Sequence, residues 1–175
     1  MSDAMNAFLT KENLDMHREY LRDLNLRYSI IEKSEPTIKG KSLSDILGMR
    51  IDIGLKSDIM RLKNEINLHK CYFSSFSLNA GTTKSIIGYY SSDADFRYRV
   101  LCAARDTEGD FVCISKNRYG VPQIYSASCT CTNAISVPAL ALDVCEHAYF
   151  YDYGFNRAEY LKRAISHLDL SLLDN

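Results

Sequence analysis

Asp143 and His147, four residues apart, are the side chains of this chain whose types and spacing best suit chemistry. An apolar run from Val137 to Val144 leads into them and aromatic residues follow, so we expect the pair where a buried strand ends and a helix begins. A carboxylate oxygen together with imidazole nitrogens is a ligand set that first-row transition metals accept in proteins. The pair therefore predicts a metal site, provided that further ligands come from elsewhere in the chain.

Two more histidines lie on the apolar stripes of predicted helices. Apolar residues recur every three or four positions between residues 11 and 33, and His17 falls on this stripe. The same spacing between residues 57 and 78 places His69 on a second stripe. A single buried histidine is more often a hydrogen-bonded core residue than a metal ligand. Two in equivalent positions, together with the carboxylate–imidazole pair, favour a site of three histidines and one aspartate.

The elements that would position these ligands are helices, then strands, then helices again. Thr10 is a suitable cap for the first helix, and Pro36 ends it. The other predicted elements are helices at 42–47, 57–78, 93–105 and 157–170, and strands at 111–115, 123–128 and 139–144. This order predicts an α+β fold, in which an N-terminal helical hairpin precedes a mixed domain with a three-stranded antiparallel sheet and flanking helices. A break at residues 79–81 predicts two domains, 1–80 and 81–175.

The amino-acid composition limits the kinds of partner and environment expected for the protein. With 175 residues, 46% of them hydrophobic, the chain can bury a substantial core, and its net charge of -1 gives no reason to expect nucleic-acid binding. No run of eighteen apolar residues is present, which predicts no membrane span. The sequence shows no signal-peptide pattern, so the six cysteines are interpreted as reduced thiols of a cytoplasmic protein.

The segment from Asp143 to Tyr149 resembles a known family signature. It reads Asp-Val-Cys-Glu-His-Ala-Tyr, and the iron/manganese superoxide dismutases have Asp-x-Trp-Glu-His-Ala-Tyr, so that only Cys145 departs. The segment from Leu68 to Phe73 is similar to the family's Asn-His-x-Phe-Tyr-Trp. Further matching pieces are Gly40 to Leu43, Asp93 to Phe96, Lys116-Asn117, Asp152-Tyr153 and Asn156-Arg157. The resemblance extends from about Phe8 to Leu170 and covers nearly the whole chain.

The resemblance implies that four residues bind the metal: His17, His69, Asp143 and His147. It implies one iron or manganese ion per chain, with a coordinated solvent molecule as a fifth ligand. The implied reaction converts superoxide to dioxygen and hydrogen peroxide. The resemblance also implies a homodimer, with Glu146 paired to the partner's ligand histidine and Phe150 in place of an interface tyrosine.

The surroundings of this centre depart from the family pattern. The position of a tyrosine that guards the substrate channel is Asn25, and that of a channel histidine is Leu21. Where a glutamine would bind the coordinated solvent, this chain has Glu65 or Thr130. Phe111 occupies a position where tryptophan is common, and the chain contains no tryptophan. Hydrogen bonds around a metal tune its potential, so these replacements bear directly on activity.

Glu65 allows three interpretations. An ionised Glu65 would place a negative charge near the metal and favour the oxidised ion. A Glu65 kept protonated by burial would donate a hydrogen bond as an amide does. A solvated Glu65 would point away from the site along its helix.

Three functions remain open at this point. The first is a divergent iron or manganese superoxide dismutase. The second is a mononuclear metal enzyme on the same scaffold, acting on an organic small molecule with dioxygen or a reactive oxygen species. The third is a non-catalytic relative, which four retained ligands disfavour. A large apolar pocket at Leu21 and Asn25 would favour the second.

Overall fold

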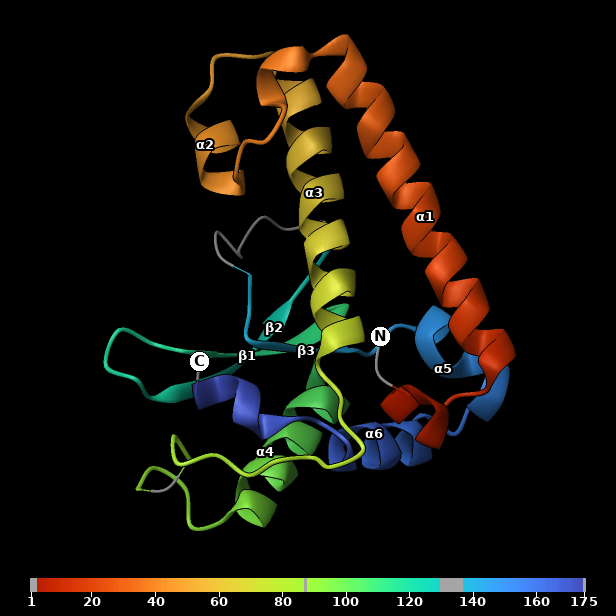
Figure 1. The fold of residues 1–175 in the computed structure, drawn as a ribbon, viewed down its shortest axis with the longest axis vertical. Coiled ribbons are helices and arrows are strands. Elements are labelled where there is room, and N and C mark those ends of the chain that lie inside the picture. Colours follow the sequence, from red (N-terminus) through yellow and green to blue (C-terminus); the bar gives the residue numbers. More distant parts are fainter. Residues whose placement is uncertain (1–2, 87, 130–136, 175) are drawn as a thin grey trace.

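Two long antiparallel helices form one end of the molecule, and a small sheet with shorter helices forms the other (Figure 1). The computed structural model describes residues 3–86, 88–129 and 137–174. The long helices are α1 (Lys11–Ser34) and α3 (Ile53–Ser74), and the short α2 (Leu43–Gly48) lies between them in the chain. Thr10 caps α1 as predicted, because its side chain accepts a hydrogen bond from the backbone N–H of Asn13.

The second half contains α4 (Asp93–Asp106), β1 (Phe111–Lys116), β2 (Pro122–Ala127), β3 (Leu140–Asp143), α5 (Glu146–Tyr153) and α6 (Arg157–Ser166). Short 3-10 helices lie at Asp3–Ala7, Pro36–Ile38 and Leu170–Asp174. The strand order is β2–β1–β3, and both pairings are antiparallel. The predicted α+β fold, with its helical N-terminal region and three-stranded antiparallel sheet, is confirmed.

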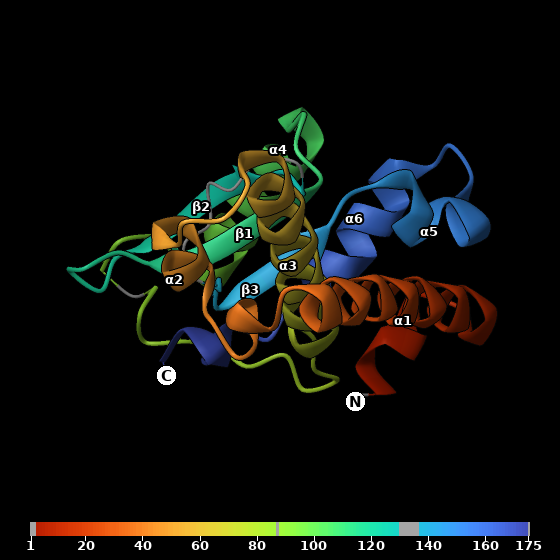
Figure 2. The same ribbon diagram turned by 90° about the horizontal axis from the view of Figure 1, so that it is seen from above.

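Helix α3 links the two ends, because it contacts α1 on one side and β3 on another (Figure 2). Leu24 of α1 packs against Leu62 and Ile66 of α3 in the seam of the hairpin. Burying each such side chain stabilises the fold by about 1.5–3 kcal/mol. A larger core joins the lower part of α3 to the sheet, α4 and α6. The division into domains at residues 80 and 81 stays a prediction.

Three predicted helix ends differ from the structure by four residues. Helix α3 ends at Ser74 and not at the predicted residue 78. Helix α3 begins at Ile53, earlier than the predicted residue 57, because the side chain of Asp52 accepts the N–H of Leu55 and caps the helix. Helix α6 ends at Ser166 instead of continuing to residue 170. Leu168 forms an isolated antiparallel bridge with Phe76, and this pairing takes the chain out of the helical path.

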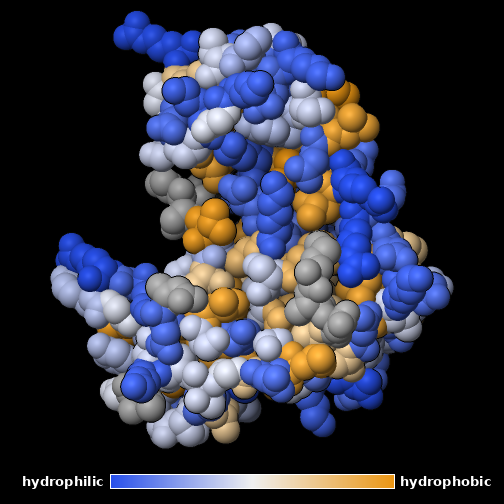
Figure 3. All heavy atoms as spheres, viewed as in Figure 1, coloured by the Kyte–Doolittle hydropathy of each residue, from blue (hydrophilic) through white to orange (hydrophobic). Residues whose placement is uncertain are grey.

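The surface seen in Figure 3 is mostly hydrophilic, with hydrophobic residues in smaller groups between the polar ones. Within the described residues, no helix combines the length and the apolar character needed to cross a membrane. All five cysteines in the described ranges carry free thiols, as predicted: Cys71, Cys102, Cys113, Cys129 and Cys145.

Candidate metal centre

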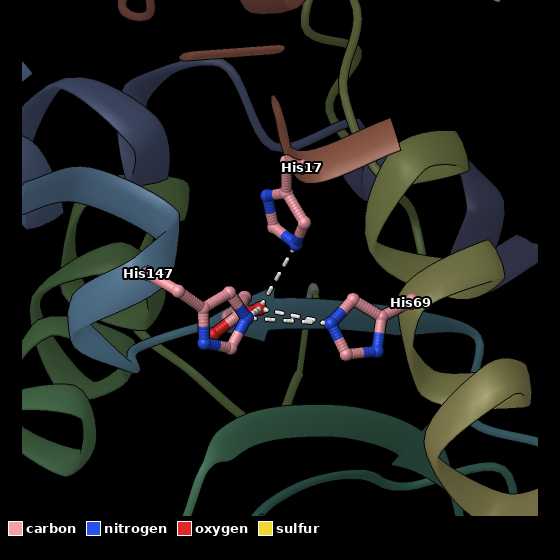
Figure 4. A group of neighbouring side chains, drawn as sticks. His17, His69 and His147 are labelled. Carbon is pink, nitrogen blue, oxygen red and sulfur yellow. Dashed lines mark hydrogen bonds and ion pairs between the residues drawn. The ribbon is translucent and has the colours of Figure 1, made fainter. Parts of the chain in front are cut away.

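Four separate elements bring the predicted ligands to one point. His17 comes from α1, His69 from α3 and His147 from the first turn of α5, and Figure 4 shows the three imidazoles converging. Asp143 is the last residue of β3. His17, His69 and Asp143 are buried, whereas 39% of the His147 side chain is exposed. The cluster therefore lies at the edge of the core, with one imidazole toward the surface.

The ligand atoms are spaced as a metal ion requires. Oδ2 of Asp143 lies 3.3 Å from Nε2 of His17, 3.5 Å from Nε2 of His69 and 3.0 Å from Nε2 of His147. The Nε2 atoms of His69 and His147 are 3.4 Å apart, and all four ligand atoms lie within 4.8 Å of one another. Two ligands each about 2.1 Å from one ion, at angles of about 90–110°, lie about 3.0–3.4 Å apart. The donor set fits a single transition ion.

A hydrogen bond to the backbone orients one of the imidazoles. Nδ1 of His69 lies 2.8 Å from the carbonyl oxygen of Glu65, so this nitrogen carries the proton and Nε2 presents a lone pair to the cluster. Neither ring nitrogen of the buried His17 makes a directed hydrogen bond with any described residue, although its Nε2 faces Asp143 at 3.3 Å. A buried nitrogen without a hydrogen-bond partner destabilises a fold unless another ligand satisfies it. A metal ion would satisfy Nε2 of His17.

The electrostatics of the cluster favour a cation. Burial alone would raise the pKa of Asp143, but the hydrogen bond from His147 and the neighbouring His17 outweigh it and hold the pKa well below its usual range. Burial lowers the pKa of His69. At His147 burial is outweighed by Asp143, which raises the pKa of the imidazole. The carboxylate thus remains ionised among imidazoles, as a ligand set for a divalent or trivalent ion must.

Asp143 is held from several directions. Its Oδ1 accepts the N–H of Cys145 at 2.9 Å, and its carbonyl oxygen accepts the hydroxyl of Tyr160 at 2.7 Å. Tyr160 in turn lies 3.2 Å, hydroxyl to hydroxyl, from Tyr72. Phe111 stands opposite Asp143 in the β1–β3 register, and its ring meets His69 edge-on at 5.2 Å. Phe111 therefore lies beside the cluster.

Comparison with known proteins agrees with this geometry. The family model for the C-terminal domain of iron/manganese superoxide dismutases matches residues 82–174, which is more than half of the chain. The chain belongs to the iron/manganese superoxide dismutase family. It is 28% identical over 174 residues to "Superoxide dismutase [Fe]" of Escherichia coli strain K12, and equally to that of Shigella flexneri. Each alignment covers 91% of this chain and 85% of the relative.

Family membership makes the chain a superoxide dismutase-like oxidoreductase of a metalloprotein family that uses iron or manganese.

Not every predicted neighbour of the metal lies at the cluster. Asn25 is exposed, and its amide donates to the carbonyl of Leu21 on its own helix at 2.6 Å. These two residues line a cavity of about 470 Å³ with Asp15, Arg18 and Arg22, and no described lining residue is one of the four ligands. Thr130 lies outside the described residues.

Glu65 is buried, so the interpretation of a solvated side chain is wrong. Its carboxylate accepts a hydrogen bond from the hydroxyl of Tyr20, a residue that the sequence analysis missed. The ring of Tyr20 lies 5.3 Å from that of His69 and 5.1 Å from that of His147. The spacing contained a signal, because Tyr20 follows His17 by three residues and thus lies near the same side of α1.

A cavity of about 320 Å³ reaches the cluster between α1 and α5. The described residues that line it are Met16, His17, Tyr20, Glu146, His147, Phe150 and Tyr151. It includes two of the ligands as well as both predicted interface residues, Glu146 and Phe150. This cavity gives a small solute access to the exposed side of His147.

Proposed function

We propose that this chain binds one iron or manganese ion through His17, His69, Asp143 and His147 and dismutates superoxide. The observation that carries the proposal is the convergence of three Nε2 atoms and one carboxylate oxygen within 4.8 Å, in a chain of this family. Two superoxide ions and two protons give one dioxygen and one hydrogen peroxide, so that electrons balance without another reductant. A coordinated solvent molecule as fifth ligand is part of the proposal.

The protein's part in the reaction is to hold the ion and restrict access to it. Iron or manganese supplies one-electron redox chemistry when bound. The Glu65 carbonyl fixes the orientation of His69, and the N–H of Cys145 holds Asp143. The ring of Phe111 excludes water on the sheet side. The α1–α5 cavity is left as the route for a small anion.

We propose further that two copies associate through the face around this cavity. The face exposes several large apolar side chains: Met16 at 49%, Phe150 at 45% and Tyr151 at 61%. Phe155 is 94% exposed and its ring meets that of Phe150 at 5.4 Å, which extends the face. A self-complementary apolar face is what a twofold dimer requires. Glu146 and Phe150 would then lie at the interface, beside His147. A cytoplasmic location stays a prediction.

The experiment that tests the reaction is stopped-flow decay of superoxide on purified protein of known iron and manganese content. We expect a metal-dependent rate that is lost in His147→Ala and retained in His167→Ala, because His167 directly follows α6 and is not in the ligand group. The matched pair separates loss of a ligand from loss of any histidine. Bound metal with decay no faster than the spontaneous reaction would overturn the proposal.

One observation favours a second candidate, a mononuclear metal enzyme that acts on an organic molecule with dioxygen. The cavity of about 320 Å³ beside His147 is mostly apolar in lining and falls at the small end of the range for ligand pockets, about 300–1,000 Å³. The larger cavity at Leu21 and Asn25 does not support this candidate, because its described lining includes none of the ligands. Substrate-dependent oxygen uptake by metal-loaded protein that is inert toward superoxide would select it.

A further inference from the structure

Tyr20 and Glu65 form a partly buried contact between the two long helices next to the metal ligands. Glu65 lies one turn before His69 on α3, so the two side chains share a face of that helix. One carboxylate oxygen of Glu65 accepts the hydroxyl of Tyr20, and the other lies 3.9 Å from Nη1 of Arg61. Both carboxylate oxygens of Glu65 thus face groups other than the four ligands.

Glu65 is itself suited to bind a metal. Carboxylates are favoured ligands of manganese and iron, and a second one beside three imidazoles and Asp143 would fill a further coordination position. The charge of Glu65 is felt within the cluster, since it helps to raise the pKa of His147. Among the described residues, however, the group of mutually close ligand atoms contains Asp143 and not Glu65. Glu65 is therefore a potential ligand that lies close to the site but is held out of it.

We infer that Tyr20 is a positioning residue whose hydroxyl holds the Glu65 carboxylate off the metal and so keeps one coordination position open to a small anion. The inference rests on the metal centre of the proposed function and not on its reaction. Tyr20 can act in this way because its ring lies over His69 and His147 while it also lines the α1–α5 cavity. The open position then faces the route by which an anion arrives.

Without the hydroxyl, the carboxylate loses a charge-assisted hydrogen bond and is free to turn toward the ion. Glu65 would then compete with any exogenous anion for the same position. Loss of one such hydrogen bond corresponds to a change on the order of tenfold or more in an equilibrium constant. Tyr20→Phe should therefore weaken anion binding at the metal by at least about tenfold, although it removes only one oxygen atom.

The test is an azide titration of the iron-loaded protein, followed by absorption spectroscopy, with iron content measured for each sample. We expect the wild type to bind one azide per iron and Tyr20→Phe to bind it at least about tenfold more weakly, with an altered spectrum before azide is added. The double variant Tyr20→Phe/Glu65→Gln should regain azide binding, because an amide is a poor competitor for the ion. Tyr20→Phe with unchanged azide affinity and spectrum would overturn the inference.

Tyr28→Phe is the matched control. Tyr28 also lies on α1 and also bonds α3, since its hydroxyl accepts from Nζ of Lys63 at 3.3 Å, but it lies away from the ligands. This control should leave the azide affinity unchanged, and a similar loss there would assign the effect to helix packing and overturn the inference.

A comparison of Glu65→Gln with Tyr20→Phe/Glu65→Gln decides the matter if Tyr20→Phe alone does not fold. With the competing carboxylate removed, Tyr20→Phe should have no effect on azide affinity, and a tenfold effect in that background would overturn the inference. A wild type that binds iron and azide but leaves superoxide decay unchanged removes the proposed reaction and keeps this inference. A wild type that binds no iron overturns both.

Discussion

The hydroxyl of Tyr160 should stabilise the metal-free protein more than the hydroxyl of Tyr72 does. Both side chains are fully buried, and the two hydroxyl oxygens lie 3.2 Å apart. Tyr160 also donates to the carbonyl oxygen of Asp143 at 2.7 Å. Tyr160→Phe therefore removes a donor to a buried carbonyl and leaves Tyr72 without this partner, which should reduce the free energy of unfolding by about 1–3 kcal/mol. Neither Tyr160→Phe nor Tyr72→Phe opens a cavity, because the ring of Phe fills the same space as the ring of Tyr.

Tyr72→Phe makes a smaller change, since Tyr160 keeps its bond to Asp143. We expect a loss of about 0.5–1.5 kcal/mol, the net value of one hydrogen bond. The assay is urea unfolding of the two single variants and the double variant at equal m-values, and the double variant should lose little more than Tyr160→Phe alone. A Tyr72→Phe variant that is less stable than Tyr160→Phe would refute this reasoning about how Asp143 is held.

Two further predictions concern the surface around the site. Asn25→Tyr should change the free energy of unfolding by no more than about 0.5 kcal/mol, and the rate of superoxide decay by no more than about twofold, because Asn25 is exposed and bonds its own helix. Urea unfolding and stopped-flow measurements test these two expectations. A large gain in rate would place residue 25 in the path of the substrate. Phe150→Glu should dissociate the proposed dimer in sedimentation experiments, because it places a charge on the apolar face. The control Tyr119→Glu also changes an exposed aromatic residue and should leave the dimer intact. A Phe150→Glu variant that sediments as the wild type does would place the interface elsewhere.

Sequence patterns were sufficient to predict the ligand cluster because each ligand has a strong local signature. His17 and His69 are polar residues on apolar stripes, and Asp143 and His147 flank the junction of a strand and a helix. Such patterns predict that each side chain is buried, and the structure brings the four ligand side chains together. The helical and strand order followed from periodicity in the same way.

Tyr20 could not be predicted in this way because its role depends on a partner from another helix. The resemblance places the family's channel tyrosine at position 25, which is Asn25 in this chain. Only the packing of α1 on α3 shows that Tyr20 reaches the carboxylate of Glu65. The end of α6 was missed for a similar reason, since the bridge between Leu168 and Phe76 joins residues far apart in the chain.

The two sides of the ligand cluster differ in kind, and this difference determines how a reactant can approach. On the core side, Phe111 packs on His69, and Tyr72 lies 5.1 Å, ring to ring, from His17. On the outer side, 39% of the His147 side chain is exposed and the α1–α5 cavity begins. Among the described residues, a cavity that includes two of the ligands opens where Tyr20 and the apolar face meet. The contact that positions Glu65 and the face proposed for the dimer thus border the same entrance.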